Sequence, residues 1–370
     1  MSSKANIPLR QLGKDGPMVP AMGFGAMGLT FHYGNPLPDE DIFAILDRAY
    51  ELGCTFWDTA DFYLLSEAAI GRWFKRTGKR DDIFLATKFG FTFQENGLGR
   101  DSSPEHCREA FEKSLKALGA ETIDLCRSNS SPSPRSERRV EEFMMPADYV
   151  HILDDVTPIE KTMEALVELQ KQGKIKHIGL SNVSARCLRR AVAIAPVAAM
   201  QAEYRLLSRE IEGTTGPERN LVSTCHELGV AIVAATPLGR GILTSTHVEG
   251  KPLGGENDQR SVMMPRFLGD NPKHNADIVK QLAVFAERKG CSLTQLALAW
   301  LLKQKDVFVI PGTRRVKYLE DNWKSATNVS LTDGEEAEIR AFAESVKIAG
   351  DPVPEGVASW YYLDSAELQD

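Results

Sequence analysis

The 370-residue sequence has little that suits a disulfide-bonded, membrane-spanning or nucleic-acid-binding protein. Its six cysteines are far apart and show no CxxC or zinc-ligand spacing, which argues against a disulfide framework and favours a reducing compartment. The longest apolar stretch, 191–200, is too short to cross a bilayer, and the amino terminus lacks the apolar core of a signal peptide. A net charge of −7 disfavours binding to phosphate backbones. We therefore expect a soluble, cytoplasmic protein without a membrane or nucleic-acid partner.

Two common hydrolase motifs are also missing. Neither HExxH nor GxSxG occurs in the chain. The first motif would supply zinc ligands and the second a nucleophilic serine. The sequence therefore gives no support to metal or acyl-enzyme chemistry, and we expect no metal.

Short apolar runs alternate with longer amphipathic segments along the chain, a pattern typical of a parallel sheet covered by helices. The runs are residues 22–27, 54–57, 83–87, 149–150, 177–180, 200–203, 231–234 and 307–310. Eight such units close most economically as an α/β fold of the (β/α)8 TIM-barrel type, a single domain over residues 1–370. Reactive side chains are then expected at the C-terminal ends of the strands.

Helix starts are readable at three places. Thr157 to Glu160 offers a capping threonine, a proline at the first helical position and a glutamate for a capping box. Ser292 to Gln295 repeats the capping box, and Ser103-Pro104 opens another helix. We expect helices to begin at all three.

Four polar residues follow successive strand-like runs. They are Asp58, Tyr63, Lys88 and His151. Taken singly, each has an ordinary structural explanation, since a strand-end histidine or a loop tyrosine is often structural and an Asp-Thr pair often caps a helix. Their order at four barrel-strand ends favours a shared catalytic role instead.

This order resembles the aldo-keto reductase superfamily, with the resemblance covering roughly residues 7–328 and being closest to microbial and plant members with a Pro-Leu-Gly-Arg-Gly loop. It implies NADPH-dependent reduction of a small aldehyde or ketone, with an N-terminal hairpin capping the barrel. A free tyrosine, with a pKa of about 10, is a poor acid at neutral pH. The resemblance implies that Asp58 holds Lys88 charged beside Tyr63, which protonates the substrate oxygen, while His151 polarises it.

Further segments resemble the cofactor-binding parts of that superfamily. Ser181, Asn182 and Gln201 match positions that bind the nicotinamide carboxamide, with Tyr204 nearby. Residues 236–241 resemble a loop whose small residues let backbone N–H groups approach the pyrophosphate, although a plain turn would also contain Pro and Gly. The predicted ligands in this loop are Thr236, Leu238, Gly239, Arg240 and Gly241. Members usually place a stacking tyrosine before the loop, where this chain has Ala235.

Residues 310–322 are the most specific match, and resemble the eighth-strand loop and helix that hold the adenosine 2′-phosphate and adenine. Arg314, Arg315 and Lys317 cluster at a predicted helix N-terminus, where backbone donors and cations favour an extra phosphate. We therefore predict NADPH rather than NADH, against the alternative of a solvated basic turn. The predicted adenosine-site residues are Gly312, Thr313, Arg314, Lys317, Asp321 and Asn322.

Residues 127–148 are foreign to this pattern. They are rich in Ser, Pro, Arg and Glu, a composition that buries too little surface to order itself. Their removal would join Cys126 to Tyr149 and restore the Asp-Leu-Tyr-Tyr-Leu-His type of run that delivers His151. One hypothesis is a retained intron. The other is a real insertion, with residues 147–151 forming the strand and the excess looped out at the bottom of the barrel.

Two regions bear on function beyond the tetrad. Residues 333–370 are expected to form a helix and a tail over the barrel mouth, unless they are simply solvated. Phe24, Met27, Trp57, Phe89 and Trp360 suggest an apolar, partly aromatic substrate pocket. The alternatives to an enzyme are a nicotinamide-sensing regulatory subunit or an inactive product of a misread transcript. The sequence motifs do not specify the substrate, the oligomeric state or the direction of the reaction.

Overall fold

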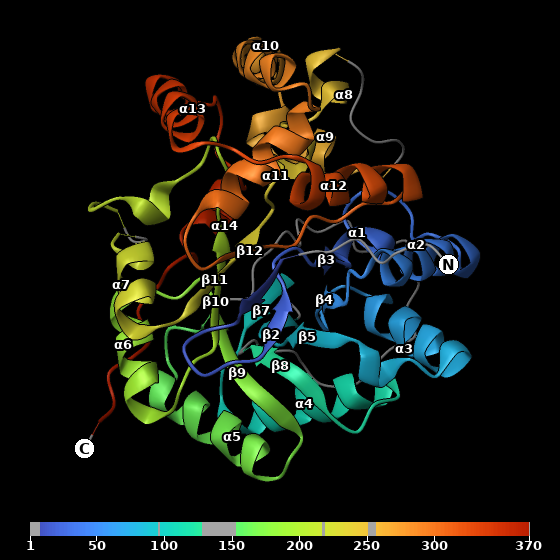
Figure 1. Ribbon diagram of the computed structural model, residues 1–370. Helices are drawn as coiled ribbons and strands as arrows, with labels where there is room; N and C mark the ends of the chain where they lie inside the picture. The colour runs from blue at the N-terminus through green and yellow to red at the C-terminus, as the bar shows by residue number, and fades with distance from the viewer. Residues whose placement is uncertain (1–7, 95–96, 128–152, 217–218, 251–256, 370) are drawn as a thin grey trace.

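The computed structural model describes residues 8–94, 97–127, 153–216, 219–250 and 257–369, and eight parallel strands within them form one curled sheet (Figure 1). Met22 is bridged to Val309, and the Gly23 N–H donates to the Val309 carbonyl at 2.8 Å, which joins the first strand to the last. The predicted (β/α)8 barrel is confirmed. Its strands, in order around the sheet, are β3 (Phe24–Gly25), β4 (Phe56–Asp58), β5 (Phe84–Lys88), β8 (Ile123–Arg127), β9 (Ile175–Ser181), β10 (Ala199–Glu203), β11 (Ala231–Ala235) and β12 (Val307–Val309).

Amphipathic helices cover the outside of the barrel (Figure 1). Helix α4 is representative, because it buries Cys107, Phe111 and Leu118 and stops at Gly119, whose φ of 60° suits a residue without a side chain. The covering helices are α2 (Asp39–Leu52), α3 (Ser66–Thr77), α4 (Pro104–Leu118), α5 (Ile159–Lys171), α6 (Ala185–Ile194), α7 (Leu221–Leu228), α11 (Leu293–Lys303) and α12 (Val316–Asn328).

Additional elements decorate this frame. The further α-helices are α1 (Met27–Thr30), α8 (Ser245–Val248), α9 (Arg260–Met263), α10 (Asn271–Lys289), α13 (Asp333–Ser345) and α14 (Glu355–Ala358). Short 3-10 turns are η1 (Arg80–Asp82), η2 (Glu210–Glu212), η3 (Gly239–Gly241) and η4 (Pro265–Phe267). A second hairpin, β6 (Phe91–Gln94) with β7 (Gly97–Arg100), follows β5. None of the described helices is both long enough and apolar enough to span a membrane.

The N-terminal hairpin closes the bottom of the barrel. Strands β1 (Leu9–Gln11) and β2 (Met18–Pro20) pair antiparallel, and Leu12 and Val19 pack against the side chains inside the barrel. The Arg10 guanidinium donates to the Val307 carbonyl at 2.6 Å, where β12 begins. The opposite, C-terminal strand ends therefore remain available for a site.

Helices begin at all three predicted places, and two of the three predicted caps are confirmed. Ser103 accepts from the His106 N–H at the start of α4, and Ser292 with Gln295 forms a complete capping box at α11. The predicted cap at Thr157 is wrong. The Asp154 carboxylate binds the Thr157 amide and hydroxyl instead, so α5 begins at Ile159 without a local side-chain cap.

The C-terminal tail lies against the C-terminal end of β9, as predicted for a tail at the barrel mouth. The Tyr362 N–H donates to the Asn182 carbonyl at 2.8 Å, and Leu363 is bridged to Val183. The Ser365 hydroxyl accepts from the Ile159 N–H at 3.0 Å and so serves the start of α5 from far along the chain. Tyr361 and Tyr362 are buried, so these aromatic side chains attach the tail to the barrel.

Strand β8 is formed by residues before the 128–148 segment, and not by residues 147–151 as the insertion hypothesis expected. Its residues are Ile123–Arg127, and Arg127 pairs with Lys88 on one side and with Gly179 on the other. The chain therefore reaches the mouth of the barrel before it enters residues 128–152. His151 and the remainder of the 127–148 segment lie outside the described residues.

Candidate functional site

Asp58 and Lys88 form a buried ion pair at the mouth of the barrel. They end the adjacent strands β4 and β5, and the Lys88 Nζ lies 2.6 Å from the Asp58 Oδ1. The two residues are 2% and 0% exposed, so neither charge is solvated and each depends on its partner. Lys88 also donates to the Thr59 carbonyl at 2.5 Å and to the Tyr63 hydroxyl at 3.4 Å.

The structure thus brings together three of the four predicted catalytic residues. The Lys88 ammonium lies 4.8 Å from the centre of the Tyr63 ring, and an ammonium at this place stabilises a phenolate. The backbone of Tyr63 is held by the Thr30 hydroxyl, which donates to its carbonyl at 2.7 Å. His151, the fourth residue, lies outside the described ranges, so its place in the tetrad stays a prediction.

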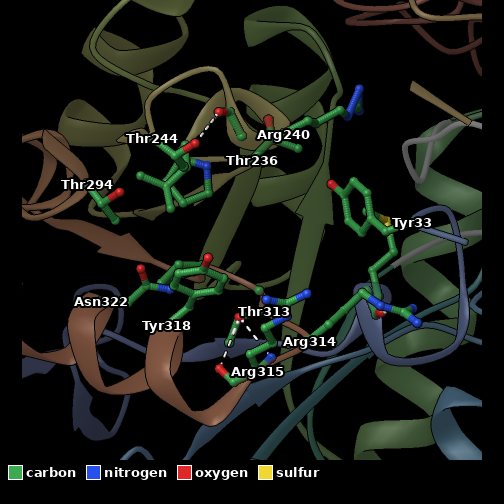
Figure 2. A pocket seen from close by; sticks show the side chains of 18 of the residues that line it. Tyr33, Thr236, Arg240, Thr244, Thr294, Thr313, Arg314, Arg315, Tyr318 and Asn322 are labelled. Carbon is green, nitrogen blue, oxygen red and sulfur yellow. Dashed lines mark hydrogen bonds between the residues drawn. The ribbon is translucent and has the colours of Figure 1, made fainter. Parts of the chain in front are cut away.

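A cavity of about 980 Å³ runs from the tetrad residues along the barrel mouth to the start of α12. Asp58 and Tyr63 line one end, and Asn322 lines the other. Figure 2 shows the region where Thr236 and Arg240 face Thr313 and Arg314. The predicted cofactor residues that line the cavity are Gln201, Thr236, Leu238, Arg240, Gly241, Gly312, Thr313, Arg314, Asp321 and Asn322.

Among the predicted nicotinamide residues, Gln201 lines the cavity beside the ion pair, whereas Ser181 and Asn182 do not line it. The Gln201 side chain donates to the Asp58 Oδ2 at 3.0 Å. The Ser181 hydroxyl is buried and has no hydrogen-bond partner among the described residues. A carboxamide is a ligand that would satisfy such a group. Asn182 has a positive φ of 49°, and Tyr204 instead directs its hydroxyl to Glu212.

The predicted pyrophosphate loop is built on charged residues that the sequence did not single out. Thr236 donates to Glu203 at 2.9 Å and accepts from Arg205 at 3.0 Å. Burial opposes ionisation of Glu203, but Arg205 and Arg240 outweigh it and lower the pKa of Glu203 to about 2. The sequence did not predict that Glu203 and Arg205 support this loop, because their contacts with Thr236 join residues more than 30 positions apart.

Two backbone amides of this loop are used within it. The Gly239 N–H donates to the Thr236 carbonyl and the Gly241 N–H to the Leu238 carbonyl. Gly239 does not line the cavity, whereas Ala235 does. The loop therefore presents side chains and Gly241 to the cavity, and the methyl group of Ala235 offers no ring for stacking.

The adenosine end of the cavity is formed after β12. Gly25 and Gly312 pack so closely that a Cβ on Gly312 would lie 2.7 Å from the Gly25 carbonyl, which explains glycine at both positions. Of the predicted basic cluster, Arg314 and Arg315 line the cavity and Lys317 does not. Tyr318 also lines it and was not singled out from the sequence. The Asp321 carboxylate is already held by Ser292 and Gln295.

Two buried carboxyl groups lie behind Lys88. Thr87 donates to Glu67 at 2.6 Å, and burial raises the pKa of Glu67 to about 7 against this hydrogen bond. Burial and the Glu67 charge raise the pKa of Asp61 well above its ordinary value. Within the described ranges, no group of three or more His, Cys, Asp or Glu residues is arranged to hold a metal ion.

Comparisons with known proteins agree with this geometry. Residues 21–344 match the profile of the Aldo/keto reductase family. The chain is 41% identical to "Aldo-keto reductase str7" of Strobilurus tenacellus over 93% of this chain and 94% of that protein. It is 40% identical to "Aldo-keto reductase yakc [NADP(+)]" of Schizosaccharomyces pombe over 98% of this chain and 99% of that protein.

Solved structures share the barrel. The glycerol dehydrogenase AKR11B4 of Gluconobacter oxydans superposes with a TM-score of 0.74 at 25% identity, covering 95% of this chain and 99% of its own. The thermostable aldo-keto reductase Tm1743 superposes with a TM-score of 0.65 at 24% identity, covering 91% and 100%. Sequence and fold together place the chain in the aldo/keto reductase family.

Proposed function

We propose that the protein reduces an aldehyde or ketone to an alcohol with NADPH. The observation that carries this proposal is Lys88, which contacts both Asp58 and Tyr63, two residues that line a cavity of about 980 Å³. Bound NADPH would supply the hydride to the carbonyl carbon. Tyr63 would donate its phenolic proton to the carbonyl oxygen, and the Lys88 ammonium would stabilise the phenolate that remains.

The residues present suit NADPH. Ser181, Asn182 and Gln201 would bind the carboxamide, where the unpaired Ser181 hydroxyl offers a ready partner. Thr236, Leu238, Arg240 and Gly241 would flank the pyrophosphate. The α12 N-terminus with Arg315 and Thr313 would bind the 2′-phosphate, since helix amides and guanidinium groups both favour anions. A relative that carries NADP(+) in its name supports the same choice.

Tyr63→Phe is the test of this proposal. The variant keeps the ring and its packing but loses the proton donor, so kcat for NADPH-dependent reduction should fall by at least about 100-fold. The dissociation constant for NADPH, measured by fluorescence, should stay unchanged. Tyr50→Phe is the matched control, because Tyr50 lies on α2 and binds Asp82 on the outer surface. Full activity in Tyr63→Phe would overturn the proposed role.

A nicotinamide-sensing regulatory subunit is the alternative. In such a protein cofactor occupancy would govern a partner, and Tyr63→Phe would leave partner binding unaffected. The buried Asp58–Lys88 pair beside a phenol favours turnover, because sensing the cofactor requires no proton donor. A screen of NADPH consumption with aromatic aldehydes, aliphatic aldehydes and ketones distinguishes the two and identifies the substrate class.

A further inference from the structure

We propose that Arg314 is a positioning residue for Tyr63, and that it acts through the chain segment 28–35. The neighbouring Arg315 is then the guanidinium group that selects the 2′-phosphate. These separate roles for Arg314 and Arg315 rest on the proposed reductase function. Arg314 then affects the rate of reduction, and not cofactor affinity alone.

Arg314 fastens both ends of the segment 28–35. Its Nη1 donates to the Gly28 carbonyl at 2.9 Å, and its Nη2 donates to the Asn35 carbonyl at 2.7 Å. Two donors of one planar guanidinium group therefore close a loop that follows β3. Figure 2 shows the Arg314 side chain extending toward the chain below Tyr33. Burial lowers the pKa of Arg314, in keeping with a group that lies partly inside the protein.

The middle of the same segment holds Tyr63. The Thr30 hydroxyl, on a residue that is 1% exposed, donates to the Tyr63 carbonyl at 2.7 Å. The Phe31 ring is stacked on the Tyr63 ring, with centroids 6.4 Å apart and planes inclined by 21°. One contact fixes the backbone of Tyr63 and the other restrains its ring, so a shift of the segment moves the phenol relative to Lys88.

The far side of the segment is attached to residues 257–263. Tyr33 is bridged to Asp258, the Gln259 N–H donates to the His32 carbonyl at 3.1 Å, and the Arg260 guanidinium lies 4.8 Å from the centre of the Tyr33 ring. The segment 28–35 thus connects the cavity lining to Tyr63. Arg314 holds this segment from the side of α12.

Arg315 differs from Arg314 in its surroundings. It is exposed, lies at the N-cap of α12, and its guanidinium is 6.0 Å from the centre of the Tyr318 ring at the rim of the cavity. A cation there faces the amide end of a helix, where a phosphate is stabilised. Arg315 is therefore placed to add affinity for the phosphate without touching the segment that holds Tyr63.

Arg314→Met and Arg315→Met separate the two roles in the full-length protein. Arg314→Met should lower the single-turnover rate at saturating NADPH by about 10-fold or more, since small misplacements of reacting groups are that costly. Its NADPH dissociation constant, measured by fluorescence, should change less than about 3-fold. Arg315→Met should raise that constant by about 10-fold or more and slow the saturated rate less than Arg314→Met does. Arg288→Met, which breaks an exposed pair with Glu338, is the control for loss of a surface arginine.

Further measurements test the link from Arg314 to Tyr63 through the segment 28–35, and the single Thr30 variants do so without a substitution at Arg314. Thr30→Val should slow reduction with NADPH affinity preserved, Thr30→Ser should restore the rate, and Thr30→Val added to Arg314→Met should cost less than the product of the single effects. Amide exchange in the cofactor-free Arg314→Met protein should accelerate at Phe31 and Leu37, whose N–H groups bond within this region.

An Arg314→Met variant that binds NADPH at least 10-fold more weakly, yet turns over at the wild-type rate when saturated, would overturn the inference and make Arg314 a phosphate ligand. Unchanged exchange at Phe31 and Leu37 would also overturn it. A wild-type protein that reduces no carbonyl with NADPH would instead overturn the proposed function.

Discussion

At the scale of single residues, Lys88 connects the stability of the site to its chemistry. Its side chain is completely buried, and its ammonium lies 2.6 Å from the Asp58 carboxylate. The same ammonium donates to the Tyr63 hydroxyl at 3.4 Å. A change at Lys88 therefore affects both a buried charge and the phenol.

Replacement of Lys88 by methionine is predicted to abolish reduction and to destabilise the fold by about 3–5 kcal/mol. The reason is that Asp58 would remain buried and charged without its partner. Urea unfolding measures the change. Adding Asp58→Asn to Lys88→Met should restore part of the lost stability, and a double variant less stable than Lys88→Met would contradict this explanation.

Glu67→Gln is predicted to stabilise the protein above neutral pH. The folded-state pKa of Glu67, about 7, lies above its ordinary value of 4.5, so the contribution of Glu67 to stability is fully present below pH 4.5 and is lost as the pH rises to about 7. Glutamine carries no charge, and the gain should approach roughly 3 kcal/mol at pH 8 and be small at pH 5.

Urea unfolding at both pH values measures this gain. Glu164→Gln is the control, because Glu164 is exposed and pairs only at the surface with Lys161. A gain for Glu67→Gln that is equal at pH 5 and pH 8 would show that burial of the Glu67 charge is not its source.

Asp58, Tyr63 and Lys88 were predictable because they follow recognisable strands, and the structure brings them into contact as expected. Thr30 and Glu67 were not predictable, because each acquires its role from a contact with a residue outside its own helix. Such contacts have no periodicity or motif that a single sequence displays.

At the scale of elements, local sequence was sufficient where the cap lies next to the helix. Ser103 and Ser292 cap α4 and α11 as predicted. At α5 the prediction failed because Asp154, a better acceptor, binds Thr157, and the distant Ser365 serves the first helical amide. Tertiary contacts of this kind override local propensity and are invisible in a window of a few residues.

Ser365→Ala is predicted to destabilise the protein by about 1 kcal/mol, because the Ile159 amide would lose its acceptor at the start of α5. Thermal and urea unfolding measure the loss. Ser345→Ala, at the exposed end of α13, is the control and should have no measurable effect. Equal stability of the Ser365→Ala and wild-type proteins would mean that the tail does not support α5.

At the scale of the whole molecule, the alternation of strands and helices predicted the barrel, and the order of its parallel strands follows the chain. The segment 127–148 interrupts this alternation, and its composition is compatible both with a retained intron and with an insertion. The described strand β8 extends through Arg127 and pairs with both neighbours, so the barrel sheet is continuous up to that point.

Deletion of residues 127–148 is predicted to raise the melting temperature, because a segment rich in Ser, Pro, Arg and Glu offers little apolar surface to offset the conformational entropy of the chain that it adds. Calorimetry of the long and short forms measures the difference. An identical melting temperature would contradict the prediction. Sequencing of the transcript tests the intron separately, and messages that all contain the segment would exclude it.

We propose that a carboxylate, an amine, a phenol and an imidazole meet at one end of the cavity. Three of these groups are in contact, and the fourth is His151. The distance between the His151 imidazole and the Tyr63 hydroxyl in a crystal structure of the NADP+ complex tests the claim most directly. We predict direct or single-water hydrogen-bond reach, whereas a separation beyond about 8 Å would contradict the catalytic assignment.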